Sequence, residues 1–187
     1  MKKLLLFFIL IPCLCFGDAG VAGVIANVSS GASSATETLA ITSDSAVTWS
    51  LTGTGDHYSN LSDDSDSTYV STSSFNNVER YELANTSASS GKTISSVRVY
   101  LRINRNTEGT GCRAFVYPSG GTYDYQDIGT ITTSFSNIYY EWTLNPADSA
   151  AWASSDIDGL LVGFRSNTDA SGTLQTSECW VEVIYVP

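Results

Sequence analysis

The chain has 187 residues, a formal net charge of -10 at pH 7, 15% charged residues and 11% aromatic residues. This length suits one domain of ordinary size. Aromatic and β-branched residues run through the chain and blocks of Lys, Glu and Leu are missing, which excludes a disordered chain and a coiled coil. The acidic balance disfavours nucleic acid as a partner, because a phosphate backbone would be repelled.

Residues 1–17 have the pattern of a secretory signal peptide. Two lysines follow Met1, an apolar stretch runs from Leu4 to Leu14, and small residues come next. We therefore expect cleavage after Gly17, with Ala19 as the alternative. The apolar stretch is too short to span a bilayer, so we predict a secreted or cell-surface protein without stable membrane insertion; an uncleaved anchor is the alternative.

Two of the four cysteines, Cys13 and Cys15, lie in the predicted signal peptide. Cys112 and Cys179 remain in the mature chain, both in strand-like stretches and both on the inferred inward faces. An even pair of cysteines in an exported protein favours one disulfide, Cys112–Cys179. Two separate buried thiols are the alternative.

Residues 18–45 are small and polar with a weak pattern, which indicates a linker or an extended arm with room for one strand. From residue 46 onward, short stretches alternate between apolar and polar residues. In the clearest, residues 93–103, the apolar side chains Val97, Val99, Leu101 and Ile103 share one face. Turn residues follow at 104–111, so we expect residues 112–117 to return as a hairpin partner.

Eight or nine such strands, separated by Gly, Ser, Asn and Asp turns, predict an all-β fold for residues 46–187. We expect an antiparallel β-sandwich of jelly-roll type. One short helical turn is predicted after Asn145, a suitable N-cap, because Pro146 fits the first helical position. Trp49, Trp142 and Trp152 are expected in the core.

Three segments carry a resemblance: Asn145–Trp152 with its N-P-x-x-x-x-x-W pattern, Leu160–Phe164, and the closing Val181–Pro187 with its V-x-V-x-Y-V-P pattern. Together with the acidic turn Asp63–Val70, they resemble a pattern in uncharacterised β-sandwich proteins of phages and environmental microbes. The resemblance covers about residues 49–187 and implies a structural or surface-binding domain without known chemistry. The signal peptide departs from a phage virion protein, which favours a secreted or cell-surface role.

Aromatic residues supply the candidate binding site. If residues 93–103 pair with both 112–117 and 177–186, four aromatic side chains share one outer sheet surface: Tyr100, Phe115, Tyr117 and Trp180. An exposed aromatic patch of this kind marks an interaction surface, because such rings stack on sugars or on partner chains. Tyr123 and Tyr125 in the following loop form a second candidate for glycan binding. They are equally well interpreted as a lid, and the chain covering this face itself is the alternative to an open patch.

Metal and catalytic sites find less support in the sequence. Asp63, Asp64 and Asp66 form a weak candidate for Ca²⁺, with a turn whose carboxylates bind local backbone NH groups as the alternative. No cofactor is otherwise predicted. His57 is the chain's one histidine and no Gly-x-Ser-x-Gly elbow accompanies it, so we predict no catalytic residues.

The sequence therefore favours a secreted, non-catalytic β-sandwich that acts as a surface structural or adhesive protein, self-assembling through its N-terminal arm. Its partners would be its own subunits or surface glycans. A carbohydrate-binding module using exposed aromatics is the first alternative. A glycan hydrolase is the second alternative. Its paired carboxylates could come from Glu79, Glu82, Glu141 or Asp156, but spacing alone cannot select a pair.

Overall fold

The computed structural model describes residues 34–87, 92–119, 121–167 and 172–186. Ten strands and two short helices lie in these ranges. They are β1 (Ala35–Val47), β2 (Ser50–Thr52), α1 (His57–Asn60), β3 (Tyr69–Thr72), β4 (Val78–Leu83), β5 (Thr93–Arg105), β6 (Cys112–Tyr117), β7 (Asp124–Asp127), β8 (Ser136–Trp142), α2 (Ser154–Ile157), β9 (Leu161–Ser166) and β10 (Leu174–Val186). The predicted signal peptide and residues 18–33 lie outside the described residues.

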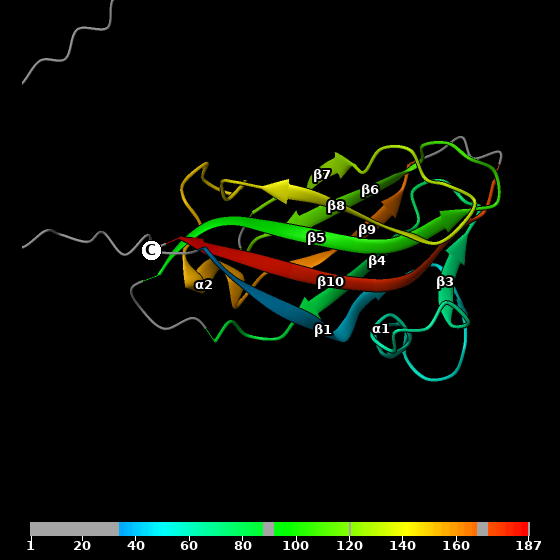
Figure 1. Ribbon diagram of the computed structural model, residues 1–187, viewed down its shortest axis with the longest axis horizontal. Coiled ribbons are helices and arrows are strands. Elements are labelled where there is room, and N and C mark those ends of the chain that lie inside the picture. Colours follow the sequence, from blue (N-terminus) through cyan, green and yellow to red (C-terminus); the bar gives the residue numbers. More distant parts are fainter. Residues whose placement is uncertain (1–33, 88–91, 120, 168–171, 187) are drawn as a thin grey trace, which may run out of the picture. The chain divides into compact units, whose positions relative to one another are not determined.

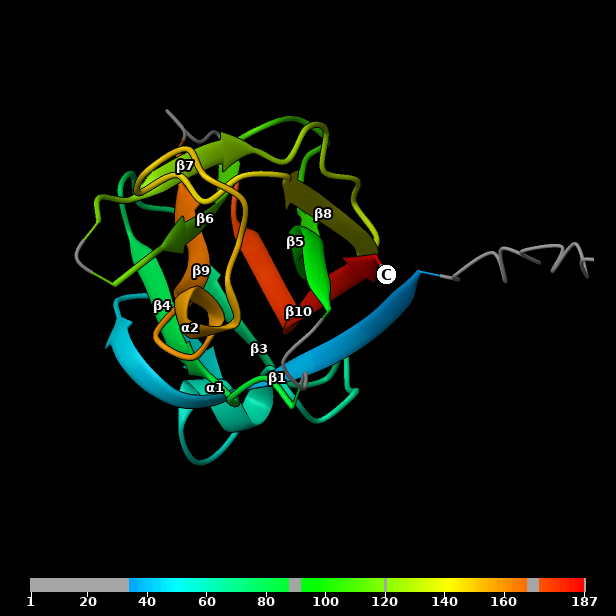
Figure 2. The same ribbon diagram turned by 90° about the vertical axis from the view of Figure 1, so that its left-hand side faces the viewer.

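The strands form two antiparallel layers joined by β1 (Figures 1 and 2). In the first layer, sheet A, β10 is flanked by β1 and β3 on one side and by β5 on the other, and β8 pairs with β5. Sheet B has the order β1–β4–β9–β6–β7. The strand β1 pairs with β10 up to Ala40 and with β4 from Ile41, so it bends from one sheet into the other. The predicted all-β sandwich is confirmed, with two short helices where one helical turn was expected.

The core lies between the two sheets and follows the alternation of the strands. The inward side chains Val97, Val99, Leu101 and Ile103 of β5 are all 0% exposed. The three tryptophans predicted to pack inside are buried, and Trp152 Nε1 donates a hydrogen bond to the backbone oxygen of Trp142 at 3.0 Å. Burial of this apolar surface drives the two layers together.

Residues 35–45 belong to β1, the one strand for which the sequence analysis left room within residues 18–45. Small and polar residues dominate this segment, but Leu39 and Ile41 point into the core and are 3% exposed. Pairing with β10 and β4 satisfies its backbone hydrogen bonds on both sides of the bend. Two apolar anchors were too few to produce a clear alternating pattern.

The predicted hairpin between residues 93–103 and 112–117 is wrong. Strand β5 pairs with β10 and β8, whereas β6 pairs with β9 and β7 in the opposite sheet. The connection through residues 106–111 is therefore a crossover between layers. Alternation places a residue on a face of a strand and carries no information about the strand's partner.

Two local predictions need correction. The segment after Asn145 forms a turn, in which the Asn145 Oδ1 atom accepts a hydrogen bond from the Ala147 backbone NH at 2.9 Å, and the helix follows at Ser154–Ile157. Cys112 and Cys179 are free thiols, so the predicted disulfide is not formed. Both face the interior as expected, but they come from opposite sheets, and burial raises the pKa of both thiols.

Candidate functional site

A row of three aromatic side chains crosses the outer face of sheet A. Antiparallel register places Trp180 of β10 opposite Tyr100 of β5, and Tyr100 opposite Tyr139 of β8. The Trp180 and Tyr100 rings are stacked, with centroids 4.9 Å apart and planes 10° apart. The Tyr100 and Tyr139 centroids are 4.8 Å apart, and Tyr139 is 46% exposed at the end of the row. We call Trp180, Tyr100 and Tyr139 the aromatic row.

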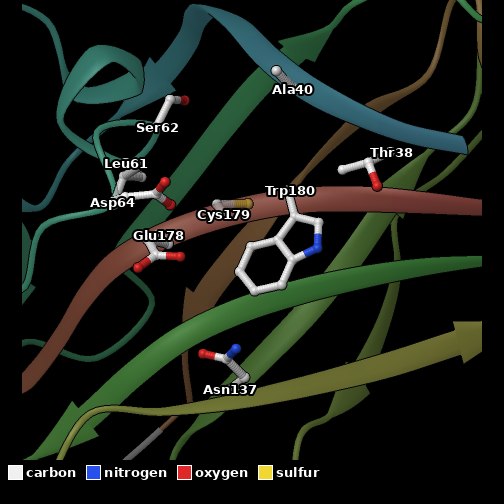
Figure 3. A pocket seen from close by; sticks show the side chains of 9 residues that line it. All are labelled: Thr38, Ala40, Leu61, Ser62, Asp64, Asn137, Glu178, Cys179 and Trp180. Atoms are coloured by element: carbon white, nitrogen blue, oxygen red, sulfur yellow. The ribbon is translucent and has the colours of Figure 1, made fainter.

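A pocket of about 430 Å³ lies beside this row. Figure 3 shows the flat side of the Trp180 indole among the lining residues. Glu178 lies two residues before Trp180 on β10, and Asn137 lies on β8. Tyr100 stacks on the indole from β5 and is not itself part of the pocket lining, so Trp180 is the member of the row that borders the pocket. On β1, the residue in register with Trp180 is Ala40, whose small side chain keeps this space open.

The opposite wall of the pocket is formed by Leu61, Ser62 and Asp64, which follow α1. Two anchors hold this wall. The backbone NH of Cys179 donates to the Leu61 oxygen at 3.1 Å, which ties the wall to β10. The Asp44 carboxylate accepts from the backbone NH groups of His57 and Tyr58 at 3.1 and 2.8 Å, which ties the start of α1 to β1.

A buried carboxylate supports the same helix from beneath. Glu79 is 0% exposed, and its Oε1 atom accepts hydrogen bonds from the backbone NH groups of Thr48 and Trp49 at 2.8 and 2.7 Å. Its Oε2 atom lies 2.8 Å from His57 Nδ1 and 2.5 Å from the Tyr81 hydroxyl. These contacts hold the His57 ring and two backbone NH groups around the Glu79 carboxylate. His57 therefore positions α1, and the pocket wall that follows α1 is formed before a ligand binds.

The acidic turn does not converge on one cation site. Asp63 accepts hydrogen bonds from the Ser65 backbone NH at 3.0 Å and the Thr68 hydroxyl at 2.6 Å. The Asp66 carboxylate accepts a hydrogen bond from Arg102, whereas Asp64 lines the pocket. Within the described ranges, no group of three or more His, Cys, Asp or Glu residues could hold a metal ion. The hydrogen bond from the Ser65 NH to Asp63 is of the kind that the alternative interpretation describes, and the Ca²⁺ site stays a prediction.

Charged pairs flank the aromatic row on both sides. Arg102 donates to Asp66 from Nε and Nη2 at 2.7 and 2.6 Å, which lowers the pKa of that carboxyl, and its Nε lies 3.4 Å from Glu178. Arg98 Nε lies 3.1 Å from Glu141, and its guanidinium is 5.1 Å from the Tyr139 ring centroid. These pairs fix the side chains around the rings and leave the ring edges exposed.

Burial raises the pKa of Glu178, and Asp64, Asp66 and Asp63 raise it further, although Arg102 acts in the opposite direction. Burial is the largest of these effects on the pKa of Glu178, and the opposing effect of Arg102 is the next. A ligand group that donates a hydrogen bond to this carboxylate would replace contacts with water that burial removes.

A second aromatic cluster lies on the outer face of sheet B. Tyr123 stacks on Tyr117 and on Tyr125, with centroids 4.3 and 5.3 Å apart, and both Tyr123 and Tyr125 contact Phe115 edge-on. Phe115 is 0% exposed beneath them. Arg80 donates a hydrogen bond to the Tyr123 hydroxyl. The predicted single surface of four aromatics is thus divided: Trp180 and Tyr100 lie on sheet A, and Phe115 and Tyr117 lie on sheet B.

Several site residues were missed by the sequence analysis. Tyr139 has the phase of an outward residue in 136–142, but only strand pairing brings it next to Tyr100. Glu178 and Asn137 carry no motif and reach the pocket through register alone. Glu79 lies within β4, and a charged residue inside a strand is a sequence signal for a buried polar cluster.

Comparison with known proteins adds no identity. No protein-family model matches the sequence, and no curated protein sequence matches it. Among solved structures, the fold is similar to the CBM22-1–GH10 modules of the N-terminal part of endo-1,4-beta-D-xylanase 10B from Clostridium thermocellum, determined in complex with xylohexaose. The TM-score is 0.44 and the sequence identity 10% over 75% of this chain. The match spans 25% of that structure's chain, so this protein corresponds to about a quarter of it.

No helix in the described part of the chain is long and apolar enough to cross a membrane.

Proposed function

We propose that this protein is a non-catalytic carbohydrate-binding module that binds a glycan chain on the outer face of sheet A. The observation that carries the proposal is the aromatic row beside the pocket. Sugar rings present apolar CH faces, which stack on aromatic rings, and hydroxyl groups, which bind carboxylates and amides. Trp180 supplies a ring face, and Glu178 and Asn137 supply the polar atoms at its edge.

The arrangement suits an extended ligand. Neighbouring rings of the row are 4.9 and 4.8 Å apart, because they stand on adjacent antiparallel strands. A chain entering at the pocket would therefore continue across β10, β5 and β8 toward the exposed ring of Tyr139. The rigid sheet and the anchored wall lower the ordering cost of binding, since the site exists before the ligand arrives.

Two expectations from the sequence belong to the proposal. The predicted signal peptide would direct the protein out of the cell, where polysaccharides are available. In the described part of the predicted arm, residues 35–40 pair with β10 of their own chain, and self-assembly through the arm stays a prediction. An adhesive role is retained only in the sense that binding a surface glycan attaches the protein to that surface.

Affinity electrophoresis tests the proposal. The full mature chain is run through gels containing soluble polysaccharides of different backbones: glucans, xylan, mannan, galactan, deacetylated chitin and polygalacturonate. We expect at least one polysaccharide to retard the protein and the Trp180→Ala variant to migrate freely. Phe75→Ala is the matched control, because Phe75 is a 58% exposed aromatic outside the row and the pocket.

Two results would overturn the proposal. One is the absence of retardation by every polysaccharide in the panel. The other is equal retardation of the Trp180→Ala variant and the native chain, which would place any glycan contact away from the aromatic row.

A further inference from the structure

The charged side chains in the lining of the pocket on sheet A are both carboxylates. Asp64 and Glu178 line it directly, and no lysine or arginine is among the described residues of the lining. Arg102 is the nearby cation, but its guanidinium is engaged by Asp66 through two hydrogen bonds of 2.7 and 2.6 Å. Its contact with Glu178 is longer, at 3.4 Å. The pocket therefore has an excess of negative charge.

The two carboxylates line the same pocket as the Trp180 indole, and Figure 3 shows both on one side of that ring. Indole is the aromatic group that attracts cations most strongly across its face. Within the described residues, no cation pairs with Asp64, and no cation is found over the Trp180 ring. A ring face and two carboxylates around one space form a suitable environment for an ammonium group.

Other glycans would fit this charge less well. A neutral sugar can donate hydroxyl hydrogen bonds to the carboxylates but leaves their charge uncompensated. A uronic acid or a sulfated sugar would place like charges together, which is repulsive in a partly buried site. An amino sugar supplies both the stacking ring and the positive charge.

We propose that the pocket selects glycans with free amino groups, such as glucosamine units, over neutral glycans, and rejects anionic ones. This inference rests on the proposed function, because it concerns the same surface. The ammonium group lies between Asp64 and Glu178, and the sugar ring stacks on Trp180.

Isothermal titration calorimetry with matched hexasaccharides tests the selectivity. The probes are β-1,4-linked glucosamine, N-acetylglucosamine and glucose, with oligogalacturonate as the anionic probe, at about pH 6, where a sugar amine is largely protonated. We expect glucosamine to bind about tenfold more tightly than glucose, from two partly exposed charge pairs. N-acetylglucosamine is expected to behave as the neutral sugar does, and galacturonate not to bind.

Charge-neutral variants separate pocket selectivity from general attraction to an acidic protein. Asp64→Asn and Glu178→Gln are expected to reduce the preference for glucosamine and to keep the affinity for glucose. Glu82→Gln is the control, since Glu82 is an exposed carboxylate of β4 in the other sheet. It removes the same charge and should leave the preference unchanged.

The outcomes distinguish the two proposals. Equal binding of glucosamine and glucose would overturn the amino-sugar inference and leave glycan binding intact. Equal loss of preference in Glu82→Gln and Glu178→Gln would also overturn it, because the attraction would then belong to the whole protein. Failure of every glycan to bind would overturn the proposed function, and the inference with it.

Discussion

The two sheets carry aromatic clusters of similar composition that differ in what covers them. On sheet B, Tyr125 of the edge strand β7 stands opposite Phe115 of β6, and the rings of Tyr123 and Tyr125 both contact Phe115, which is 0% exposed. On sheet A, no described strand lies over the aromatic row, and Tyr139 at its end is 46% exposed. The two clusters therefore differ at one ring each: Phe115 is buried on sheet B and Tyr139 is exposed on sheet A, whereas their other rings are half-buried.

The arginines have the same kinds of partner on both sheets. On sheet B, Arg80 and Arg165 lie over tyrosine rings, with 5.8 Å from Arg80 to Tyr123 and 5.0 Å from Arg165 to Tyr125. On sheet A, Arg98 lies 5.1 Å from the Tyr139 ring, and Arg102 pairs with carboxylates next to the pocket. The difference that concerns a ligand is therefore the pocket beside Trp180, which two carboxylates line.

The largest expected effect comes from the cluster on sheet B. Phe115→Ala removes a ring that is 0% exposed and should lower the free energy of unfolding by about 3–5 kcal/mol. The affinity of the folded protein for a glycan should not change, because Phe115 lies on the other sheet. Urea denaturation measures the first effect, and a loss below about 1 kcal/mol would contradict the view that this cluster is structural.

Tyr139→Ala tests the far end of the aromatic row. It should weaken binding of a hexasaccharide by about tenfold and leave the binding of a disaccharide unchanged, because only a longer ligand reaches β8. The stability should change little, since the side chain is 46% exposed. Calorimetric titration with ligands of both lengths provides the measurement, and equal weakening for both would place the short ligand elsewhere in the site.

Tyr123→Phe removes a single hydroxyl from the cluster on sheet B. That hydroxyl accepts the hydrogen bond from Arg80, so its loss should cost about 0.5–1.5 kcal/mol of stability. Thermal unfolding detects a change of this size. Weaker glycan binding by the folded variant would show that the two faces are coupled and would break the comparison.

The smallest effect depends on pH and concerns β1, the strand that both sheets share. Burial raises the pKa of Glu37, but hydrogen bonds from Ser87, Tyr185 and Thr86 outweigh it and lower the pKa from 4.5 to about 2. The charged carboxylate therefore stabilises the fold fully above about pH 4.5, and this contribution is lost as the pH falls toward 2.

Glu37→Gln checks this contribution. The variant should be less stable than the native chain at neutral pH, by less than about 1 kcal/mol because solvent screens the group. The difference should shrink as the pH falls below 4.5. Denaturation curves at several pH values measure it, and a difference that grows in acid would contradict the role of these hydrogen bonds.

The sequence predicts which side chains share a face of a strand better than it predicts which strands pair. Alternation placed Tyr100 and Trp180 on an outer face, and the expected pairing of residues 93–103 with 177–186 brought them together as observed. The same reasoning placed Phe115 with them, because it assumed a hairpin where the chain crosses to sheet B. Side chains alternate between the two faces of a strand whichever strand it pairs with, so the sequence pattern could not reveal this error.

The pocket wall could not be predicted from local sequence. Its position depends on Asp44 and Glu79, which lie far from α1 in the chain and hold it through the backbone of His57 and Tyr58 and the ring of His57. Hydrogen bonds of this range leave no periodic signal. The carboxylates of the turn were visible as a cluster, but whether each one faces a cation, an arginine or a pocket is decided by tertiary contacts.

Quenching of tryptophan fluorescence by acrylamide tests the central claim most directly. The chain has four tryptophans, and Trp49, Trp142 and Trp152 are only 4%, 5% and 4% exposed. Trp180 is partly exposed on sheet A and should supply nearly all the quenchable emission. The account predicts that hexasaccharides of β-1,4-linked glucose or glucosamine reduce the quenching in the native chain and in Tyr123→Phe. Quenching unchanged by a bound hexasaccharide would contradict the assignment of the site to the aromatic row.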